Sequence, residues 1–217
     1  MMCSLPFSEE SIKLCAKAVL AGDAVVYPTE TMYGIAVDAL SPTAVKKLFA
    51  IKKRKADKPL PVIVGDRNML ELMVRNFSQN SLKLMEHFWP GPLTLIFDAT
   101  KVVPSVLTAD TGTVAVRLSS CEAAQRLASS VGRAITATSA NTSGKVGAFD
   151  PEEIKGELGT AVSLMIDVGK FPPSLPSTIV DARGEGLLIL REGVISSNNI
   201  FEVLGKRSNG APRASAV

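Results

Sequence analysis

Basic residues gather in one short stretch of the chain, Lys52-Lys53-Arg54-Lys55, with Lys58 three positions further on. The whole sequence is nearly balanced, with 24 Lys and Arg against 21 Asp and Glu. The stretch therefore creates a local positive field. It follows a predicted helix and precedes a short apolar segment, a place where cations could bind phosphates. On composition alone, a solvated charged loop is the favoured alternative.

A second set of polar side chains follows several predicted strands. Ligands of open α/β sheets bind at strand ends, so the joint occurrence of these residues indicates one shared cleft. Taken one at a time, each residue could equally be a turn residue, a helix cap or a surface ion pair. The set consists of Thr29, Thr31, Tyr33, Arg117, Ser139, Asn141 and Arg191.

The elements that must position these residues can be predicted from the apolar pattern and from cap residues. Strands are expected over 24–27, 60–64, 93–97, 114–117, 134–138, 163–168, 177–181 and 187–190. Helices are expected from Ser8 to Gly22, over 42–51, 67–74, 80–88 and 120–131, briefly after Asp150, and over 197–204. Residues 28–34 are expected to form a loop. Helices and strands alternate and some strands are adjacent, so we expect an α/β fold with an open, twisted, mixed sheet flanked by helices.

Composition restricts the class of protein. The 217 residues are 46% hydrophobic, enough for one core, so we expect a single domain over 1–205 and a disordered tail over 206–217. Three cysteines without a CxxC pair argue against a disulfide framework or zinc site. We see neither a membrane-spanning run nor a secretory signal and expect a cytoplasmic protein. The net charge of +3 permits an anionic ligand or RNA.

Seven short motifs occur in an order typical of one family. They are PTETMYG at 28–34, Lys52-x-Arg54, WPGPLT at 89–94, VAVR at 114–117, SANxSG at 139–144, STIVD at 177–181 and LRxG at 190–193. Over residues 8–195 the chain thus resembles the YrdC-like threonylcarbamoyl-AMP synthases, in their single-domain form. The resemblance implies a YrdC-like fold with a concave, positively charged cleft.

The resemblance also implies a reaction. L-threonine, bicarbonate and ATP would give threonylcarbamoyl-AMP and pyrophosphate, with Mg²⁺ balancing the triphosphate charge. The enzyme would be a nucleotidyltransferase. A tRNA threonylcarbamoyltransferase complex would then move the product's acyl group onto tRNA. A carboxylate must attack the α-phosphorus of ATP, so catalysis would rest on positioning and charge neutralisation.

Site residues follow from the matching motifs. Two cations would be catalytic, Lys52 and Arg54, which could reach around one phosphate chain from an extended loop. The residues expected to bind ATP are Arg54, Lys58, Ser139, Asn141 and Arg191. The residues expected to bind threonine are Thr31, Arg117, Ala137 and Ser177. We expect no direct protein ligand for the metal. Tyr33 would either line the pocket or pack as an aromatic, and His87 would pack at a helix end.

Two other interpretations stay open. An RNA-binding or ribosome-assembly module could use the basic stretch without turnover, although only 5% of the residues are aromatic and base-stacking platforms are scarce. A paralogue could use the fold on another acyl substrate. Its main support is Ile63, which stands where many members of the family carry a histidine.

Overall fold

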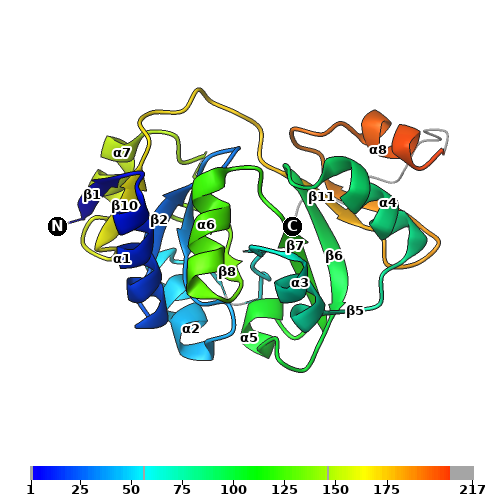
Figure 1. The fold of residues 1–217 in the computed structure, drawn as a ribbon, viewed down its shortest axis with the longest axis horizontal. Coiled ribbons are helices and arrows are strands. Elements are labelled where there is room, and N and C mark those ends of the chain that lie inside the picture. The colour runs from blue at the N-terminus through cyan, green and yellow to red at the C-terminus, as the bar shows by residue number, and fades with distance from the viewer. Residues whose placement is uncertain (1, 56, 146, 206–217) are drawn as a thin grey trace.

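The computed structural model describes residues 2–55, 57–145 and 147–205, and helices alternate with strands along them (Figure 1). The helices are α1 (Glu9–Leu20), α2 (Pro42–Ile51), α3 (Arg67–Met73), α4 (Gln79–Phe88), α5 (Ser105–Thr108), α6 (Glu122–Val131), α7 (Pro151–Leu158) and α8 (Ser197–Val203). The strands are β1 (Cys3–Pro6), β2 (Val25–Pro28), β3 (Tyr33–Ala36), β4 (Val62–Ile63), β5 (Val74–Arg75), β6 (Leu93–Ala99), β7 (Thr113–Arg117), β8 (Ile135–Thr136), β9 (Thr138–Ser139), β10 (Leu164–Asp167), β11 (Thr178–Asp181) and β12 (Leu188–Arg191). The expected tail over 206–217 lies outside the described residues.

The strands form two mixed sheets. One has the order β1-β10-β2-β3-β9 and the other β12-β11-β6-β7-β4-β8, with β5 added beside β6. In the first sheet β10 and β2 run parallel while β2 and β3 run antiparallel. In the second, β11 and β6 are parallel while β6 and β7 are antiparallel. The predicted mixed α/β fold is confirmed, but its strands are shared between two sheets.

The chain passes from one sheet to the other at Ala137. The strand expected over 134–138 is divided there, since β8 pairs with β4 and β9 pairs with β3. The amide of Ala137 donates to the carbonyl of Pro61 at 2.8 Å, a bond outside the ladders of either sheet. A continuous apolar pattern does not reveal such a division, because both halves are buried alike.

The predicted loop over 28–34 was wrong at its end, because Tyr33 opens strand β3. Gly34, the last residue of the expected loop, pairs with Tyr27 inside the sheet. A Cβ at Gly34 would lie 3.2 Å from the Tyr27 ring, so the glycine admits a close aromatic contact. Strand β1 was also missed. It lies at the sheet edge, where a strand carrying serine and proline is tolerated.

One apolar core joins the two sheets. It contains Val26 and Ile35 from the first sheet and Leu95, Phe97 and Val116 from the second. Alternate residues of β2 point the other way, into a second cluster beneath α1 and α6. These two helices pack side by side over β2 (Figure 1). None of the helices in the described part of the chain has the length and apolar character that crossing a membrane requires.

Most of the helices in the described residues begin at a side chain that caps their N-terminus, close to the starts expected from the sequence. Ser8 accepts a hydrogen bond from the amide of Ser11, and Ser41 accepts one from the amide of Ala44. Asp150 caps α7 in the same way. These local contacts set the start of each helix and the length of the loop before it.

Candidate functional site

Lys52 is a buried cation that holds a distant turn. Its side chain is almost fully enclosed, and its Nζ donates to the carbonyls of Ser139 and Asn141, each at 2.5 Å. Burial, together with the nearby charge of Arg54, lowers the pKa of Lys52 to about 8, although Glu157 acts in the opposite direction. Two carbonyl acceptors offset part of the cost of burying the charge. The ammonium therefore ties the end of α2 to the turn after β9.

The expected extended loop around Lys52 is wrong. Lys52 caps the C-terminus of α2 with helical backbone angles, φ −80° and ψ −5°, and Lys53 follows in the left-handed region at φ 50°. The helix continues to residue 51 because Val45, Leu48 and Phe49 bury one face of it. Its backbone geometry turns the chain so that Lys52 points inward while Lys53 is exposed.

The turn after β9 keeps its side chains close together. The hydroxyl of Ser139 donates to Asn141 Oδ1 at 2.6 Å, and Asn141 Nδ2 donates to the carbonyl of Lys145 at 3.0 Å. The amide of Ser143 donates to the carbonyl of Lys52 at 2.9 Å. The structure thus brings together Lys52, Ser139 and Asn141, three of the residues that the sequence singled out.

Arg54 follows Lys52 by two residues, and part of its hydrogen-bonding capacity is unused. Its Nη2 donates to the carbonyl of Pro59 at 3.1 Å, which closes the basic loop on itself. Its Nε is buried and has no hydrogen-bond partner among the described residues. Burial lowers the pKa of Arg54, while Asp57 raises it. Lys58 is half-buried in the same loop. A buried donor without a partner indicates a place for an acceptor.

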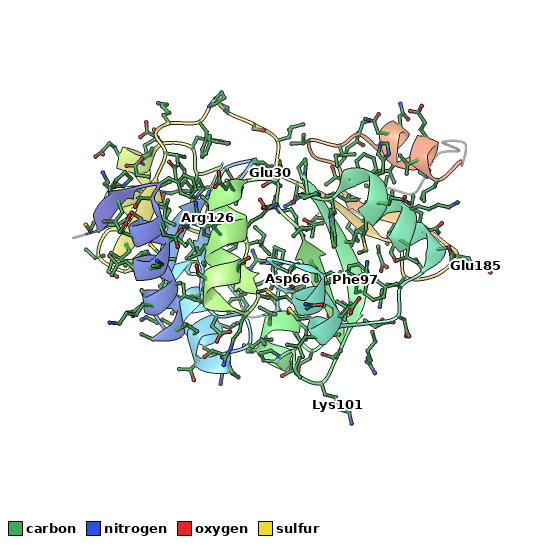
Figure 2. All side chains as sticks on the ribbon, in the orientation of Figure 1. Glu30, Asp66, Phe97, Lys101, Arg126 and Glu185 are labelled. Carbon is green, nitrogen blue, oxygen red and sulfur yellow. The ribbon has the colours of Figure 1, made fainter. Side chains whose placement is uncertain are left out.

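A second group of polar residues forms around Arg117, the last residue of β7. Arg117 is 5% exposed, and its Nη1 lies 3.6 Å from Oε1 of Glu30. The other oxygen of Glu30 accepts a hydrogen bond from the hydroxyl of Ser119. Thr29 and Thr31, on either side of Glu30, have hydroxyl oxygens 3.1 Å apart. Figure 2 shows Glu30 in the upper middle of the molecule, above the helices α6 and α3.

Arg191 and Ser177 complete this second group. Arg191 donates from Nε and Nη2 to the carbonyl of Ser177, at 3.0 and 2.8 Å, and from Nη2 to the Ser177 hydroxyl at 3.1 Å. That hydroxyl lies 2.9 Å from Oγ1 of Thr94. Burial of the guanidinium lowers the pKa of Arg191, and the positive charge of Arg117 lowers it as well. Arg191, expected with the nucleotide, thus lies among residues expected to bind the amino acid.

Gly193 is required for that arrangement. A Cβ at Gly193 would lie 2.0 Å from the carbonyl oxygen of Pro176, and this contact involves backbone that cannot move aside easily. The amide of Gly193 also donates to the hydroxyl of Thr178 at 3.0 Å. The glycine in the motif 190–193 therefore lets the segment after β12 pack against the segment that carries Ser177.

Strand β3 connects the two groups. Thr31 lies two residues before Tyr33, and the carbonyl of Tyr33 accepts from the amide of Ala140 at 2.9 Å. Gly34 pairs with Ser139 in the ladder. Ala137, expected in the amino-acid pocket, lies at the crossing between the sheets and is partly buried. The backbone of β3 therefore links the segment that carries Thr31 to the turn that carries Ser139 and Asn141.

Three other residues that the sequence singled out lie outside these two groups. Tyr33 is fully buried, packs against Phe171 with ring centroids 5.0 Å apart, and donates to the carbonyl of Gly169 at 2.7 Å, so it is a packed aromatic. His87 is exposed and its ring contacts Phe88, in neither group. The side chain of Ile63 belongs to the second core cluster.

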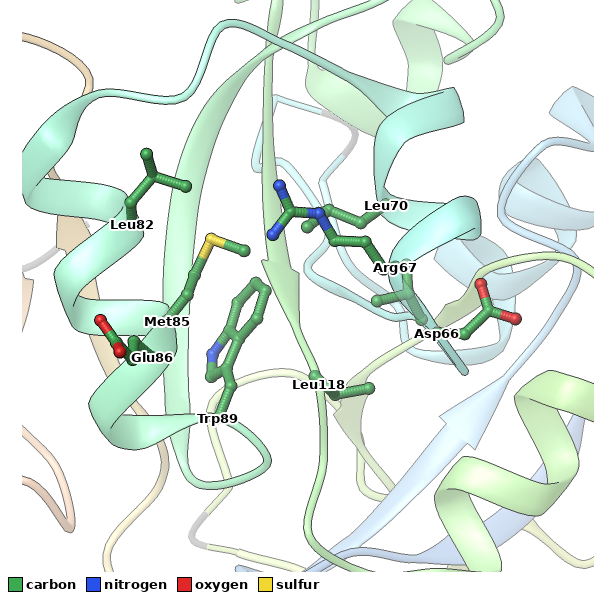
Figure 3. A pocket seen from close by; sticks show the side chains of 9 residues that line it. Asp66, Arg67, Leu70, Leu82, Met85, Glu86, Trp89 and Leu118 are labelled. Atoms are coloured by element: carbon green, nitrogen blue, oxygen red, sulfur yellow. The ribbon is translucent and has the colours of Figure 1, made fainter.

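Two hollows were not indicated by the sequence. A cavity of about 380 Å³ lies between α3 and α4, where Arg67 projects toward Met85 and Trp89 (Figure 3). It contains none of the predicted site residues. A second hollow of about 480 Å³, beside α7, is lined in part by Asn141, Lys145 and Glu157. The second therefore opens onto the turn that Lys52 holds.

Sequence reasoning missed Glu30 and Thr94 as members of the site. Both stand inside quoted motifs, Glu30 between the two threonines of 28–34 and Thr94 at the end of 89–94. A charged residue between two buried threonines, directly after a buried strand, is a signal that could have been used.

The chain was compared with protein families and with known proteins. Residues 17–193 match the Sua5/YciO/YrdC family model, described as telomere recombination. A threonylcarbamoyl-AMP synthase of Pyrococcus abyssi is 34% identical over 198 residues, which are 91% of this chain and 58% of that protein. One of Vibrio vulnificus is 34% identical over 182 residues, 82% of this chain and 97% of that protein.

Solved structures resemble the whole described chain. The crystal structure of P. abyssi Sua5 complexed with L-threonine has a TM-score of 0.89 at 31% identity, covering 100% of this chain and 66% of that one. E. coli YciO has a TM-score of 0.83 at 25% identity, covering 93% and 100%. The chain thus spans less than two thirds of the P. abyssi protein and nearly the full length of the others.

Proposed function

The chain belongs to the Sua5/YciO/YrdC family, and we propose on that basis that it is an L-threonylcarbamoyladenylate synthase. It would make threonylcarbamoyl-AMP and pyrophosphate from L-threonine, bicarbonate and ATP. One observation carries the proposal. Arg54 and Arg117 each have a buried Nε without a hydrogen-bond partner among the described residues, one in each of the two joined groups. Two separate anionic acceptors, a phosphate chain and a carboxylate, would satisfy them.

The two groups divide the substrates between them. The phosphates of ATP would lie near Arg54 and Lys58, beside the turn of Ser139 and Asn141. The carboxylate of threonine would meet Arg117, with Thr31, Ala137 and Ser177 lining the pocket. Arg191, which donates to the carbonyl and hydroxyl of Ser177, would serve the place where the two substrates meet. The L-threonine in the P. abyssi Sua5 complex supports threonine as the amino acid.

The chemistry needs positioning more than acid–base groups. The nitrogen of threonine would first add to the carbon of bicarbonate with loss of water, which gives N-carboxythreonine. An oxygen of that N-carboxylate would then attack the α-phosphorus of ATP, and the bond from that phosphorus to the bridging oxygen of pyrophosphate would break. This makes the enzyme a nucleotidyltransferase. Arg54 and Arg191 would offset charge that grows on the phosphate oxygens. Mg²⁺ carried by the triphosphate would supply the remaining positive charge.

The product is a reactive mixed anhydride that another protein must use. We propose that a tRNA threonylcarbamoyltransferase complex receives it and that the chain works in the cytoplasm. Contact with tRNA itself stays a prediction from the basic stretch.

A pyrophosphate-release assay tests the proposal. We expect release to require ATP, threonine, bicarbonate and Mg²⁺ together. Serine should be a poorer substrate by about 1–3 kcal/mol, the usual worth of one methyl group in a fitted pocket. Valine should be poorer still, because the polar groups that met the hydroxyl would be unpaired. Equal release without threonine, or with valine, would instead indicate a paralogue with another acyl substrate. No release, with tight salt-sensitive RNA binding, would indicate the RNA-binding module.

A further inference from the structure

We propose that Glu30 is a positioning residue for the amino-acid half of the site, an inference that rests on the function proposed above. Glu30 and Arg117 come from different sheets. Glu30 follows β2 in the first sheet and Arg117 ends β7 in the second. Their side chains are 14% and 6% exposed, so their attraction is only weakly screened by water. The pair therefore links the two sheets at the place where the substrate carboxylate would bind.

The carboxylate of Glu30 is itself held from behind. One oxygen accepts the hydrogen bond from the hydroxyl of Ser119, which is fully buried. Ser119 in turn accepts from the amide of Cys121 at 3.2 Å and, through its carbonyl, from Gln125 Nε2 at 2.5 Å. Cys121 and Gln125 belong to the start of α6. The orientation of Glu30 is thus set by a helix that packs on the core.

The guanidinium of Arg117 is oriented but not saturated. Its Nη1 lies 3.6 Å from Glu30, which is an ion pair without a hydrogen bond. Its Nε, like Glu30 Oε1, is buried and has no hydrogen-bond partner among the described residues. The charge of Arg117 is thus balanced by Glu30, while its Nε keeps an N–H that none of the described residues accepts. Such a guanidinium is positioned to bind a second carboxylate.

The negative charge of Glu30 also offsets the repulsion between the positive charges of Arg117 and Arg191. Arg117 lies close enough to Arg191 for its charge to act on that residue, while Arg191 is held by Ser177. Without a negative charge beside it, Arg117 would gain by moving away from Arg191 and toward solvent. We therefore expect the loss of the Glu30 charge to displace Arg117 and to weaken threonine binding. ATP binding by the residues around Lys52 should change little.

The test compares Glu30→Gln, which keeps the shape and removes the charge, with Glu30→Asp, which keeps the charge. Glu122→Gln is the matched control, since it removes a carboxylate that is exposed and paired with Arg126. We expect Glu30→Gln to raise the KM for threonine by about tenfold or more, the equivalent of one hydrogen bond to a charged group. The KM for ATP should stay unchanged, Glu30→Asp should recover part of the loss, and Glu122→Gln should behave as the original protein.

Calorimetric titration of threonine and a melting curve accompany the kinetics. Parallel increases in both KM values, or a lower Tm with an unchanged KM for threonine, would overturn the inference. Should Glu30→Gln not fold, Ser119→Ala gives the second measurement, because it releases Glu30 without touching Arg117. It should weaken threonine binding to a smaller degree, and unchanged binding would count against the inference.

Calorimetry also separates this inference from the proposed function. If the original protein binds threonine but releases no pyrophosphate, the proposed function fails, and weaker threonine binding by Glu30→Gln would still support the role of Glu30. If pyrophosphate is released and Glu30→Gln binds threonine as tightly as the original protein, the inference fails alone. A protein that neither binds threonine nor releases pyrophosphate overturns both.

Discussion

The ammonium nitrogen of Lys52 lies 2.5 Å from the backbone carbonyl oxygen of Asn141, although 89 residues separate them in the chain. Nζ makes an equally short contact with the carbonyl of Ser139. Both acceptors belong to the backbone, so Lys52 shapes the turn whatever ligand is bound. Lys52 therefore influences the nucleotide half of the site through the turn that carries Ser139 and Asn141.

Replacing Lys52 with methionine should loosen this turn. The change keeps much of the side-chain volume and leaves two buried carbonyls without their donor, at a cost of about 1–3 kcal/mol each in unfolding free energy. We expect weaker binding of a non-hydrolysable ATP analogue, with threonine binding unchanged, measured by calorimetry beside denaturant unfolding. Lys47→Met is the control, because Lys47 is on the same helix and exposed. Weaker ATP binding at full stability would show that Lys52 contacts the phosphates directly.

Lys52 also predicts a dependence on pH. Burial lowers its pKa in the folded protein from 10.5 to about 8, opposed in part by Glu157. Between these two values the unfolded chain binds more protons than the folded protein, so the contribution of Lys52 to the unfolding free energy rises with pH. We expect the stability of the original protein relative to Lys52→Met to increase from about pH 8 to about pH 10. ATP affinity should fall over the same range, as the ammonium loses its charge. A stability difference that is flat across this range would contradict the assignment.

Arg54 should matter to the chemical step. Its Nε has no hydrogen-bond partner among the described residues, and Nη2 already holds the carbonyl of Pro59. We expect Arg54→Ala to lower kcat/KM for ATP. The loss of transition-state stabilisation should be about 2–4 kcal/mol, the usual worth of one preorganised hydrogen-bond donor. Arg54→Lys should recover only part, because a lysine lacks the planar fork. Lys55→Ala is the control, since Lys55 is exposed in the same loop. Unchanged kinetics in Arg54→Ala would place this loop outside the active site.

Arg117→Ala should raise the KM for threonine far more than that for ATP. It should also destabilise the protein by about 3–5 kcal/mol, because it leaves the carboxylate of Glu30 buried without its partner. The double variant Glu30→Gln/Arg117→Ala should regain much of that stability without regaining threonine affinity. Denaturant unfolding and steady-state kinetics together separate the two effects. Equal increases in both KM values would mean that the two halves of the site are assigned wrongly.

Much of the local structure could be predicted. Ser8, Ser41 and Asp150 cap helices as expected, because a cap depends on residues only two or three positions apart. Ser139 and Asn141 were correctly grouped for the same reason, since their side chains meet within one turn. The cations of the basic stretch were located, but their directions were not. Lys52 faces inward because a helix, and not an extended loop, ends there.

The amino-acid sequence by itself determined the alternation of helices and strands, the helix starts and the motifs that mark the family. These depend on periodicity and on contacts between near neighbours. Tertiary structure alone decided that the strands form two sheets, that Lys52 binds the turn after β9, and that Glu30 lies against Arg117. Each of these depends on which distant strands pair and in which register. A single residue of register moves a side chain to the opposite face, and no local pattern records that choice.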